Sequence, residues 1–185
     1  MAQKAIAAAT EASSGAAAGW APSPNDVPIG DYGTDYFVRT LVSNEGFGAN
    51  RAEFAVYQNT ATDKSGKALS GAEGAAYSLT FPPGELPPVD GFWSVTVYDA
   101  VGYLTANDFG RYALGSNSGL VVESSGEMVL TFSRVPPDAI EFAPGSDFNP
   151  EQRRYSMKNW LPVPDGPFQL TLRLYGPSDA VLTEE

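Results

Sequence analysis

Apolar and polar residues alternate in three stretches of the chain, 93–97, 128–132 and 168–174. A period of two is typical of a strand that buries one face and turns the other toward solvent. In the last stretch a shift of one residue in register would bury Arg173, so the pairing of that strand should be strongly specified. We expect the apolar sides of all three stretches to share one interior between two stacked sheets.

Four further segments have the features of strands and bring the predicted number to about seven, enough for two packed sheets. They are centred on Tyr77, Tyr112, Val121 and Trp160. We expect Val121 to lie in a hairpin with 128–132, because the Ser and Gly residues between the two can reverse the chain.

One helix is predicted, over residues 32–43, because its large apolar residues recur with the spacing of a single helical face. Those residues are Tyr32, Tyr36, Phe37 and Leu41. Residues 59–74 are rich in Thr, Ser, Gly and Lys, which is typical of an exposed, mobile hairpin or loop. Residues 135–158 show little periodicity and should form an irregular connection over the surface.

The composition fits one β domain preceded by an arm. Ten Phe, nine Tyr and three Trp supply core material, while 19 Gly and 15 Pro imply many turns and short elements. A chain of 185 residues is long enough for one sizeable core. We therefore predict a mainly β protein, with an N-terminal arm and proline-rich linker over residues 1–28 and a β-sandwich domain over residues 29–185.

The balance of charge argues against nucleic acid as a partner. Eleven basic and 22 acidic residues give a formal charge of −11, which repels phosphate backbones and anionic lipid surfaces. The apolar run at residues 5–9 is too short for a secretory signal, and no run of about 18 apolar residues is present to span a bilayer. The sequence leaves the compartment open.

Cysteine and histidine are both absent from the chain. Their absence removes disulfides, cysteine-based zinc sites, cysteine nucleophiles and any Ser-His-Asp triad. Any chemistry must therefore use carboxylates, Tyr, Lys, Arg, Ser or Thr.

Five motifs, taken in order, resemble one protein family. They are Tyr32-Gly-Thr-Asp-Tyr36-Phe-Val-Arg39, Phe92-Trp93-Ser94 with Tyr98-Asp99, Asn107 with Arg111-Tyr112, Asn159-Trp-Leu-Pro-Val-Pro164, and Leu172-Arg-Leu-Tyr175. Over residues 30–177 the chain resembles the family catalogued as domain of unknown function 1214, usually the C-terminal half of two-domain bacterial proteins. The resemblance implies a jelly-roll-like antiparallel β-sandwich with one helix and no established reaction. It also implies a second sandwich domain upstream, so we expect a natural short form or a fragment.

The first candidate site lies on the predicted helix, where Asp35 and Arg39 are four residues apart. Together they could clamp a ligand through a carboxylate and a guanidinium. The alternative is an ordinary ion pair, which contributes less than about 1 kcal/mol when it is exposed.

A second candidate gathers Asp99, Asn107, Asp108 and Arg111 around one turn and loop. Their oxygens suit a hard cation such as Ca²⁺, although the spacing of an EF-hand is absent. The alternative is that Asp and Asn serve as turn residues and that Arg111 holds the loop by hydrogen bonds. No other cofactor is expected.

Aromatic residues supply the remaining candidates. The Trp160 indole could stack on a sugar with Asn159 at its rim, or it could plug one end of the sandwich. Tyr98 and Arg173 both point outward on their strands, and we expect them to meet across the sheet by a cation–π contact or a hydrogen bond.

Three functions follow as hypotheses. The preferred one is a non-catalytic module that binds a ligand, such as a saccharide, beside an exposed Trp, or packs against another domain or subunit. The second is a glycan hydrolase that pairs Asp99 with Asp90, Asp108 or Asp165 across a cleft of about 5–10 Å. The third is a self-assembling structural protein, in which the arm reaches a neighbour.

Overall fold

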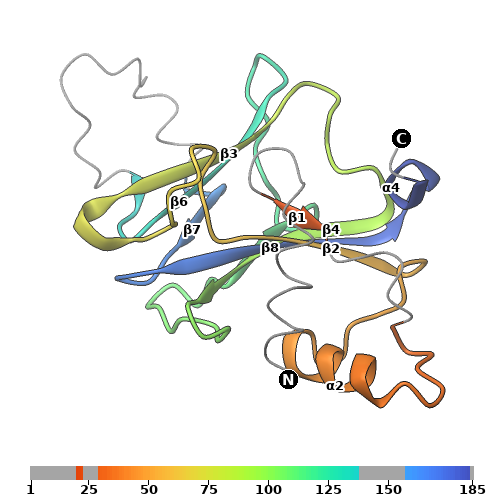
Figure 1. Ribbon diagram of the computed structural model, residues 1–185. Helices are drawn as coiled ribbons and strands as arrows, with labels where there is room; N and C mark the ends of the chain where they lie inside the picture. Colours follow the sequence, from red (N-terminus) through yellow and green to blue (C-terminus); the bar gives the residue numbers. More distant parts are fainter. Residues whose placement is uncertain (1–19, 23–28, 138–156, 184–185) are drawn as a thin grey trace.

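The computed structural model describes residues 20–22, 29–137 and 157–183, which form two sheets around one core (Figure 1). The larger sheet has the order β1-β2-β8-β4-β5 and is antiparallel throughout. Its strands are β1 (Ala21–Pro22), β2 (Ala55–Thr60), β4 (Val89–Asp99), β5 (Ala113–Gly115) and β8 (Phe168–Pro177). The smaller sheet has the order β3-β6-β7, with β3 (Ala76–Phe81), β6 (Met128–Ser133) and β7 (Trp160–Pro162).

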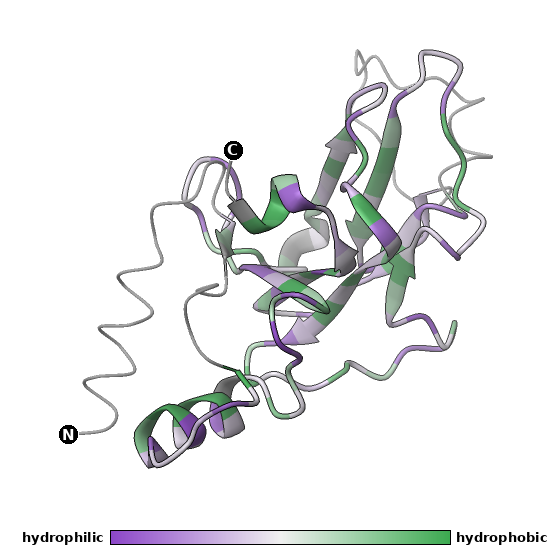
Figure 2. Ribbon diagram, turned by 90° about the vertical axis from the view of Figure 1, so that its right-hand side faces the viewer, coloured by the Kyte–Doolittle hydropathy of each residue, from purple (hydrophilic) through white to green (hydrophobic). Residues whose placement is uncertain are grey.

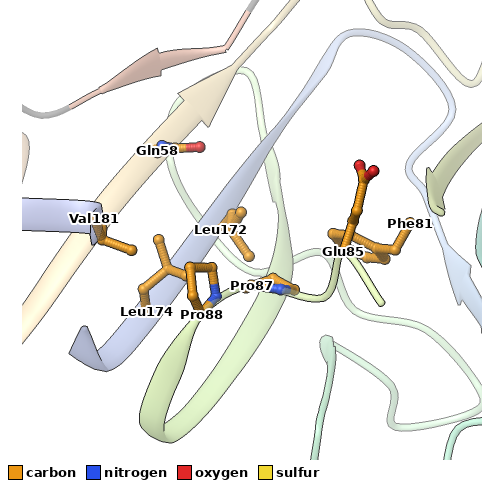
Figure 3. Close-up of a pocket in the computed structure, with 8 residues that line it drawn as sticks. All are labelled: Gln58, Phe81, Glu85, Pro87, Pro88, Leu172, Leu174 and Val181. Carbon is orange, nitrogen blue, oxygen red and sulfur yellow. The ribbon is translucent and has the colours of Figure 1, made fainter. Parts of the chain in front are cut away.

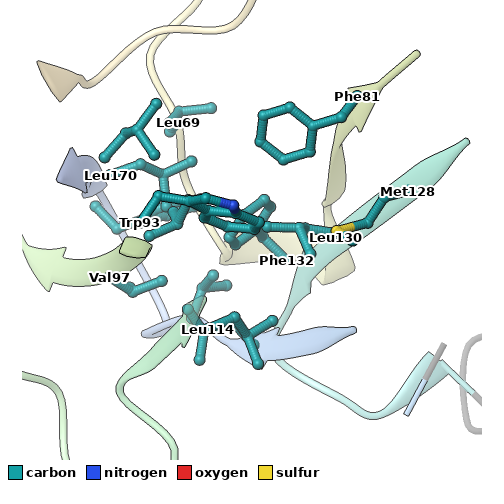
Figure 4. Packing of buried hydrophobic residues seen from close by; sticks show 14 of the residues in the cluster. Leu69, Phe81, Trp93, Val97, Leu114, Met128, Leu130, Phe132 and Leu170 are labelled. Carbon is teal, nitrogen blue, oxygen red and sulfur yellow. The ribbon is translucent and has the colours of Figure 1, made fainter. Parts of the chain in front are cut away.

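The core forms because the register of β4 and β8 sets their apolar residues opposite one another. The opposed pairs are Trp93 with Leu174, Val95 with Leu172, and Val97 with Leu170. None of these six side chains is more than 8% exposed. Leu130 and Phe132 of the smaller sheet meet them from the other side, as Figure 4 shows, and both are fully buried. The predicted shared interior between two sheets is therefore confirmed.

An irregularity in β4 brings two aromatic rings together on the other face of the larger sheet. The register with β8 shifts between Val89 and Phe92. A Cβ atom on Gly91 would lie 2.5 Å from the carbonyl oxygen of Tyr175, so only glycine fits there. The rings of Phe92 and Tyr175 then stack, with centroids 4.3 Å apart and planes inclined by 18°.

Helix α2 (Tyr36–Glu45) begins four residues later than the predicted helix over 32–43. Asp35 is its N-cap, because the Asp35 Oδ1 atom accepts the backbone N–H of Val38 at 3.0 Å. Tyr32 lies in the preceding turn, where its carbonyl accepts the N–H of Asp35. Among the described residues, the sequence did not predict the 3₁₀ helix η2 (Ala72–Gly74) or helix α4 (Asp179–Thr183).

The predicted hairpin between Val121 and β6 is wrong. The chain does reverse at 123–126, where the Gly126 N–H donates to the Glu123 carbonyl at 2.9 Å, but the residues before the turn are not a strand. Strand β6 instead pairs antiparallel with β3 and parallel with β7. The mainly β sandwich is confirmed, with one parallel pair in the smaller sheet where an antiparallel sandwich was expected.

The loop over 59–74 is more closely attached to the core than its composition suggests. Leu69 is buried, and its carbonyl accepts the N–H of Phe168 at the start of β8. Strand β1 pairs with β2 at the edge of the larger sheet, inside the segment expected to be a linker. Most of the predicted arm and most of the connection over 135–158 lie outside the described residues.

Candidate functional site

The loop between β4 and β5 uses its predicted site residues to hold its own backbone. The Asp99 Oδ1 atom accepts the N–H groups of Val101 at 3.0 Å and Tyr103 at 2.9 Å. The Asn107 amide makes four hydrogen bonds to backbone groups within residues 105–111. Both side chains therefore act as turn-forming residues.

Arg111 joins this loop to the smaller sheet. Its Nη1 atom donates to the carbonyls of Met157 and Trp160, the second at 2.8 Å. In the described part of the chain, no three His, Cys, Asp or Glu side chains are grouped to hold a metal ion. Calcium binding at Asp99, Asn107 and the exposed Asp108 stays a prediction.

The Asn159 side chain bonds to backbone groups that a neighbouring strand would otherwise pair with. It is 4% exposed, its Oδ1 atom accepts the N–H of Val121 at 2.9 Å, and its Nδ2 atom donates to the carbonyl of Val121 at 2.8 Å. The same Nδ2 atom donates to the carbonyl of Val129 at 3.0 Å. The side chain thus satisfies the backbone where the predicted hairpin would have paired.

The indole of Trp160 plugs the sandwich. It is fully buried, and its Nε1 atom donates to the Ser133 hydroxyl at 2.9 Å and to the Ser133 carbonyl at 3.2 Å. The Phe109 ring packs edge-on against it, with centroids 4.8 Å apart. Trp93 is also buried, and Trp20 packs against the core. The prediction of an exposed Trp beside a groove is therefore wrong for Trp93 and Trp160, while Trp20 is half-buried.

The predicted pair of Asp35 and Arg39 does not form. Both residues are exposed, and the Asp35 carboxylate caps the helix instead. The ion pairs among the described residues are Arg51 with Glu53 and Arg134 with Asp165.

The carboxylates proposed for a hydrolase are spread over exposed positions. Asp90 and Asp108 are exposed, and Asp165 pairs with Arg134 at 3.2 Å. The hydrolase stays a prediction without support from these positions.

The carboxylate of Asp63 lies in the turn at 63–66, where the Ser65 hydroxyl donates to it at 2.6 Å. This bond, aided by the backbone N–H groups of Ser65 and Lys67, holds the pKa of Asp63 below its usual range.

A pocket of about 310 Å³ opens on the core-facing side of β8 (Figure 3). Leu172 and Leu174 of β8 line it, and Glu85 and Gln58 supply its polar side chains. Its full lining is Gln58, Phe81, Glu85, Pro87, Pro88, Leu172, Leu174 and Val181. The pocket brings together none of the residues predicted as site residues.

The opposite face of the larger sheet, here called the outer face, holds the predicted contact of Arg173 with Tyr98. The Arg173 Nη2 atom donates to the Tyr98 hydroxyl at 2.7 Å, and Nη1 donates to the Thr96 hydroxyl at 3.0 Å. The guanidinium carbon lies 5.5 Å from the Tyr98 ring centroid and 5.9 Å from that of Tyr57. This contact is confirmed.

The other members of the outer face were missed by sequence reasoning. They are the outward residues of β2, β4 and β8 that register sets around Arg173: Tyr57, Asn59, Phe92, Ser94, Thr96, Gln169, Thr171 and Tyr175. Their alternate spacing was visible in β4 and β8, but the neighbours of Arg173 depend on which strands pair.

The fold and these sites define a two-sheet β-sandwich whose described polar groups mostly hold its own loops. One protein family matches the chain over residues 54–155 and 145–179, and it is described as Protein of unknown function (DUF1214). The chain belongs to this family. No curated protein matches the chain.

Two solved structures are similar to the chain. The VPA0106 protein from Vibrio parahaemolyticus is 24% identical with a TM-score of 0.58, over 79% of this chain and 32% of that one. An uncharacterized protein from Burkholderia cenocepacia is 16% identical with a TM-score of 0.40, over 71% of this chain and 27% of that one. The chain thus spans about a third of the length of these proteins. The first likeness supports the fold.

Proposed function

We propose that the protein is a non-catalytic β-sandwich module that acts by docking, and that α2 and its flanks dock onto a second copy of the chain. The observation that carries this proposal is a set of exposed aromatic side chains, here called the α2 aromatic surface. Tyr36 is 70% exposed, Phe37 48%, Phe47 93% and Phe54 61%. Exposed aromatic residues gathered near one helix mark an interaction surface.

The helix itself needs a partner. Figures 1 and 2 show α2 standing apart from both sheets, and none of its side chains described is buried. A ten-residue helix is marginal in water, so most of its stability must come from packing. Docking would supply that packing and would cover the aromatic side chains.

The size of the surface suits a weak dimer. The exposed parts of four aromatic side chains amount to roughly 500 Å². Two copies that meet through this surface would bury roughly 1,000 Å², the lower end for specific interfaces. The charge of −11 on each copy opposes association, so an apolar surface is the one through which two copies can meet.

Light scattering and sedimentation over a range of concentrations test this docking. We expect a reversible dimer with a dissociation constant of about 10–100 μM. Added salt should tighten it, because salt screens the repulsion between two acidic copies. The triple substitution Tyr36→Ser, Phe37→Ser and Phe47→Ser should weaken association by about tenfold or more, a loss of at least 1.4 kcal/mol.

A matched control removes exposed apolar residues from another place. Val101→Ser, Tyr103→Ser and Leu104→Ser alter the loop after β4, whose side chains are also exposed, and should leave the dimer unchanged. A chain that stays monomeric at every concentration refutes self-docking, and so does an equal loss of association in both triple variants. A separate domain would then be the remaining occupant for the surface.

A further inference from the structure

Arg173 is held in place with no acidic partner among the described residues. Four strands contribute outward positions to this face: β2, β5, β8 and the part of β4 from Phe92 to Tyr98. Arg173 is the one charged residue among these positions. Two hydroxyls accept from its guanidinium, two tyrosine rings flank it, and no carboxylate of the described residues lies in ion-pair range. In a chain with twice as many acidic as basic residues, the part that the structure describes thus holds a fixed cation with no counter-charge of its own.

The groups around Arg173 have more donors than acceptors. A guanidinium has five N–H groups, and two of them meet acceptors among the described residues. The Tyr57 hydroxyl accepts two hydrogen bonds from Asn50, each of 2.9 Å, and so keeps its own proton to donate. The Tyr98 hydroxyl accepts from Arg173 and likewise keeps its proton. A carboxylate accepts hydrogen bonds only, so it complements this surplus.

A flat apolar plate lies beside these donors. Tyr175 is two residues from Arg173 on the same face of β8, about 7 Å along the strand. Its ring stacks on Phe92, which is 39% exposed. A ligand whose carboxylate meets Arg173 can lay a ring against this plate, because flat rings pack well on aromatic faces.

We propose that the outer face of the larger sheet binds a carboxylate attached to a ring, with Arg173, Tyr57 and Tyr98 holding the carboxylate and the Phe92–Tyr175 stack holding the ring. The charge of the chain favours a single negative charge over a phosphate, because every added charge meets the repulsion of an acidic protein. The fork of the guanidinium matches two carboxylate oxygens. This site lies on the face of β8 opposite the pocket of Figure 3.

Titration of the full chain, followed by NMR, tests the site with two pairs of probes. Galacturonate with galactose represents a sugar acid, and benzoate with benzyl alcohol represents an aromatic acid. We expect at least one carboxylate to bind with a dissociation constant of about 1 mM and its neutral counterpart to bind about tenfold more weakly or worse. The pair with the larger difference identifies the source of the ring.

Substitutions then locate the binding. Arg173→Lys keeps the charge but loses the fork, and Tyr98→Phe keeps the ring but loses one donor, so each should weaken the carboxylate by about tenfold. Arg134→Lys is the matched control, since Arg134 is exposed and pairs with Asp165, and it should bind as the natural chain does. If Arg173→Lys fails to fold, the affinity of Tyr98→Phe for the carboxylate decides whether it binds at the outer face.

Three results would overturn the proposal. The first is that neither carboxylate binds more tightly than its neutral counterpart. The second is that both folded variants keep the affinity of the unsubstituted chain. The third is that inorganic phosphate binds more tightly than either carboxylate. Because these probes are small and are compared at one protein concentration, the result is independent of whether the chain dimerises.

Discussion

Two regions of the molecule each contain an arginine that makes side-chain hydrogen bonds, but the partners of these bonds differ. At one end of the sandwich, Arg111, Asn159 and Trp160 direct every hydrogen bond that they make through their side chains toward backbone groups or Ser133. On the outer face, Arg173 and Tyr98 meet side chains only. The partners in the first region are therefore mostly backbone groups, whereas those in the second are side chains, although each arginine donates two hydrogen bonds to acceptors among the described residues.

The difference follows from the backbone beneath each region. Around Asn159 the chain is irregular at Val121, so its N–H and carbonyl groups need partners, and a nearby amide supplies them. Beneath Arg173 the strands are already paired on both sides, by β2 and by β4. Polar side chains above paired strands therefore have only one another, solvent or a ligand to bind.

The largest effect is expected at Asn159. The substitution Asn159→Ala removes the three hydrogen bonds of a buried side chain and takes a partner from backbone groups of the half-buried Val121 and Val129. Each such group costs about 1–3 kcal/mol, so we expect a loss of about 3–5 kcal/mol in the free energy of unfolding, measured in urea.

Asn117→Ala is the control for this change, because Asn117 is exposed in the turn after β5. It should alter stability by no more than about 0.5 kcal/mol. If Asn159→Ala is as mild as this control, the contrast between the two regions is lost.

A smaller effect on stability is expected on the outer face. Arg173→Met keeps the length of the side chain but removes its donors. Water can reach the half-buried Tyr98 hydroxyl in its place, whereas the Thr96 hydroxyl is buried and loses the donor that it had in Arg173. We expect urea unfolding to show a loss of about 1–2 kcal/mol. A loss as large as that of Asn159→Ala would mean that Arg173 holds the sheet together, and the outer face would then resemble the first region.

The sequence predicted the fold better than the sites. The alternation in 93–97 and 168–174 identified the buried faces correctly because one periodic pattern and one core decide them together. The hairpin at Val121 was wrong because the partner of that residue is an amide side chain 38 positions away. No local pattern contains such a contact.

The same limit applies to the candidate residues. Asp99, Asn107 and Trp160 have the chemistry of binding residues, but the groups they bind are those of their own loops and strands. The contact of Arg173 with Tyr98 was predictable because both are outward residues on strands of strong alternation. The neighbouring Tyr57 was not, since it depends on the pairing of β2 with β8.

The smallest effect is expected at Asp63, which is an exposed counterpart of the Asn159 arrangement. Its carboxylate accepts hydrogen bonds from the Ser65 hydroxyl and from the backbone of Ser65 and Lys67, which lowers its pKa from the usual value of 3.8. A pKa lowered by folding contributes stability above the unfolded value, and that contribution is lost as the pH falls through the folded value. Asp63→Asn should therefore melt slightly below the natural chain near neutral pH, with a difference that shrinks below about pH 4. Ser65→Ala removes the largest cause of the lowered pKa, so its difference in melting temperature from the natural chain should also shrink below about pH 4, by a smaller amount. A difference in melting temperature that stays constant with pH would contradict the role given to this carboxylate.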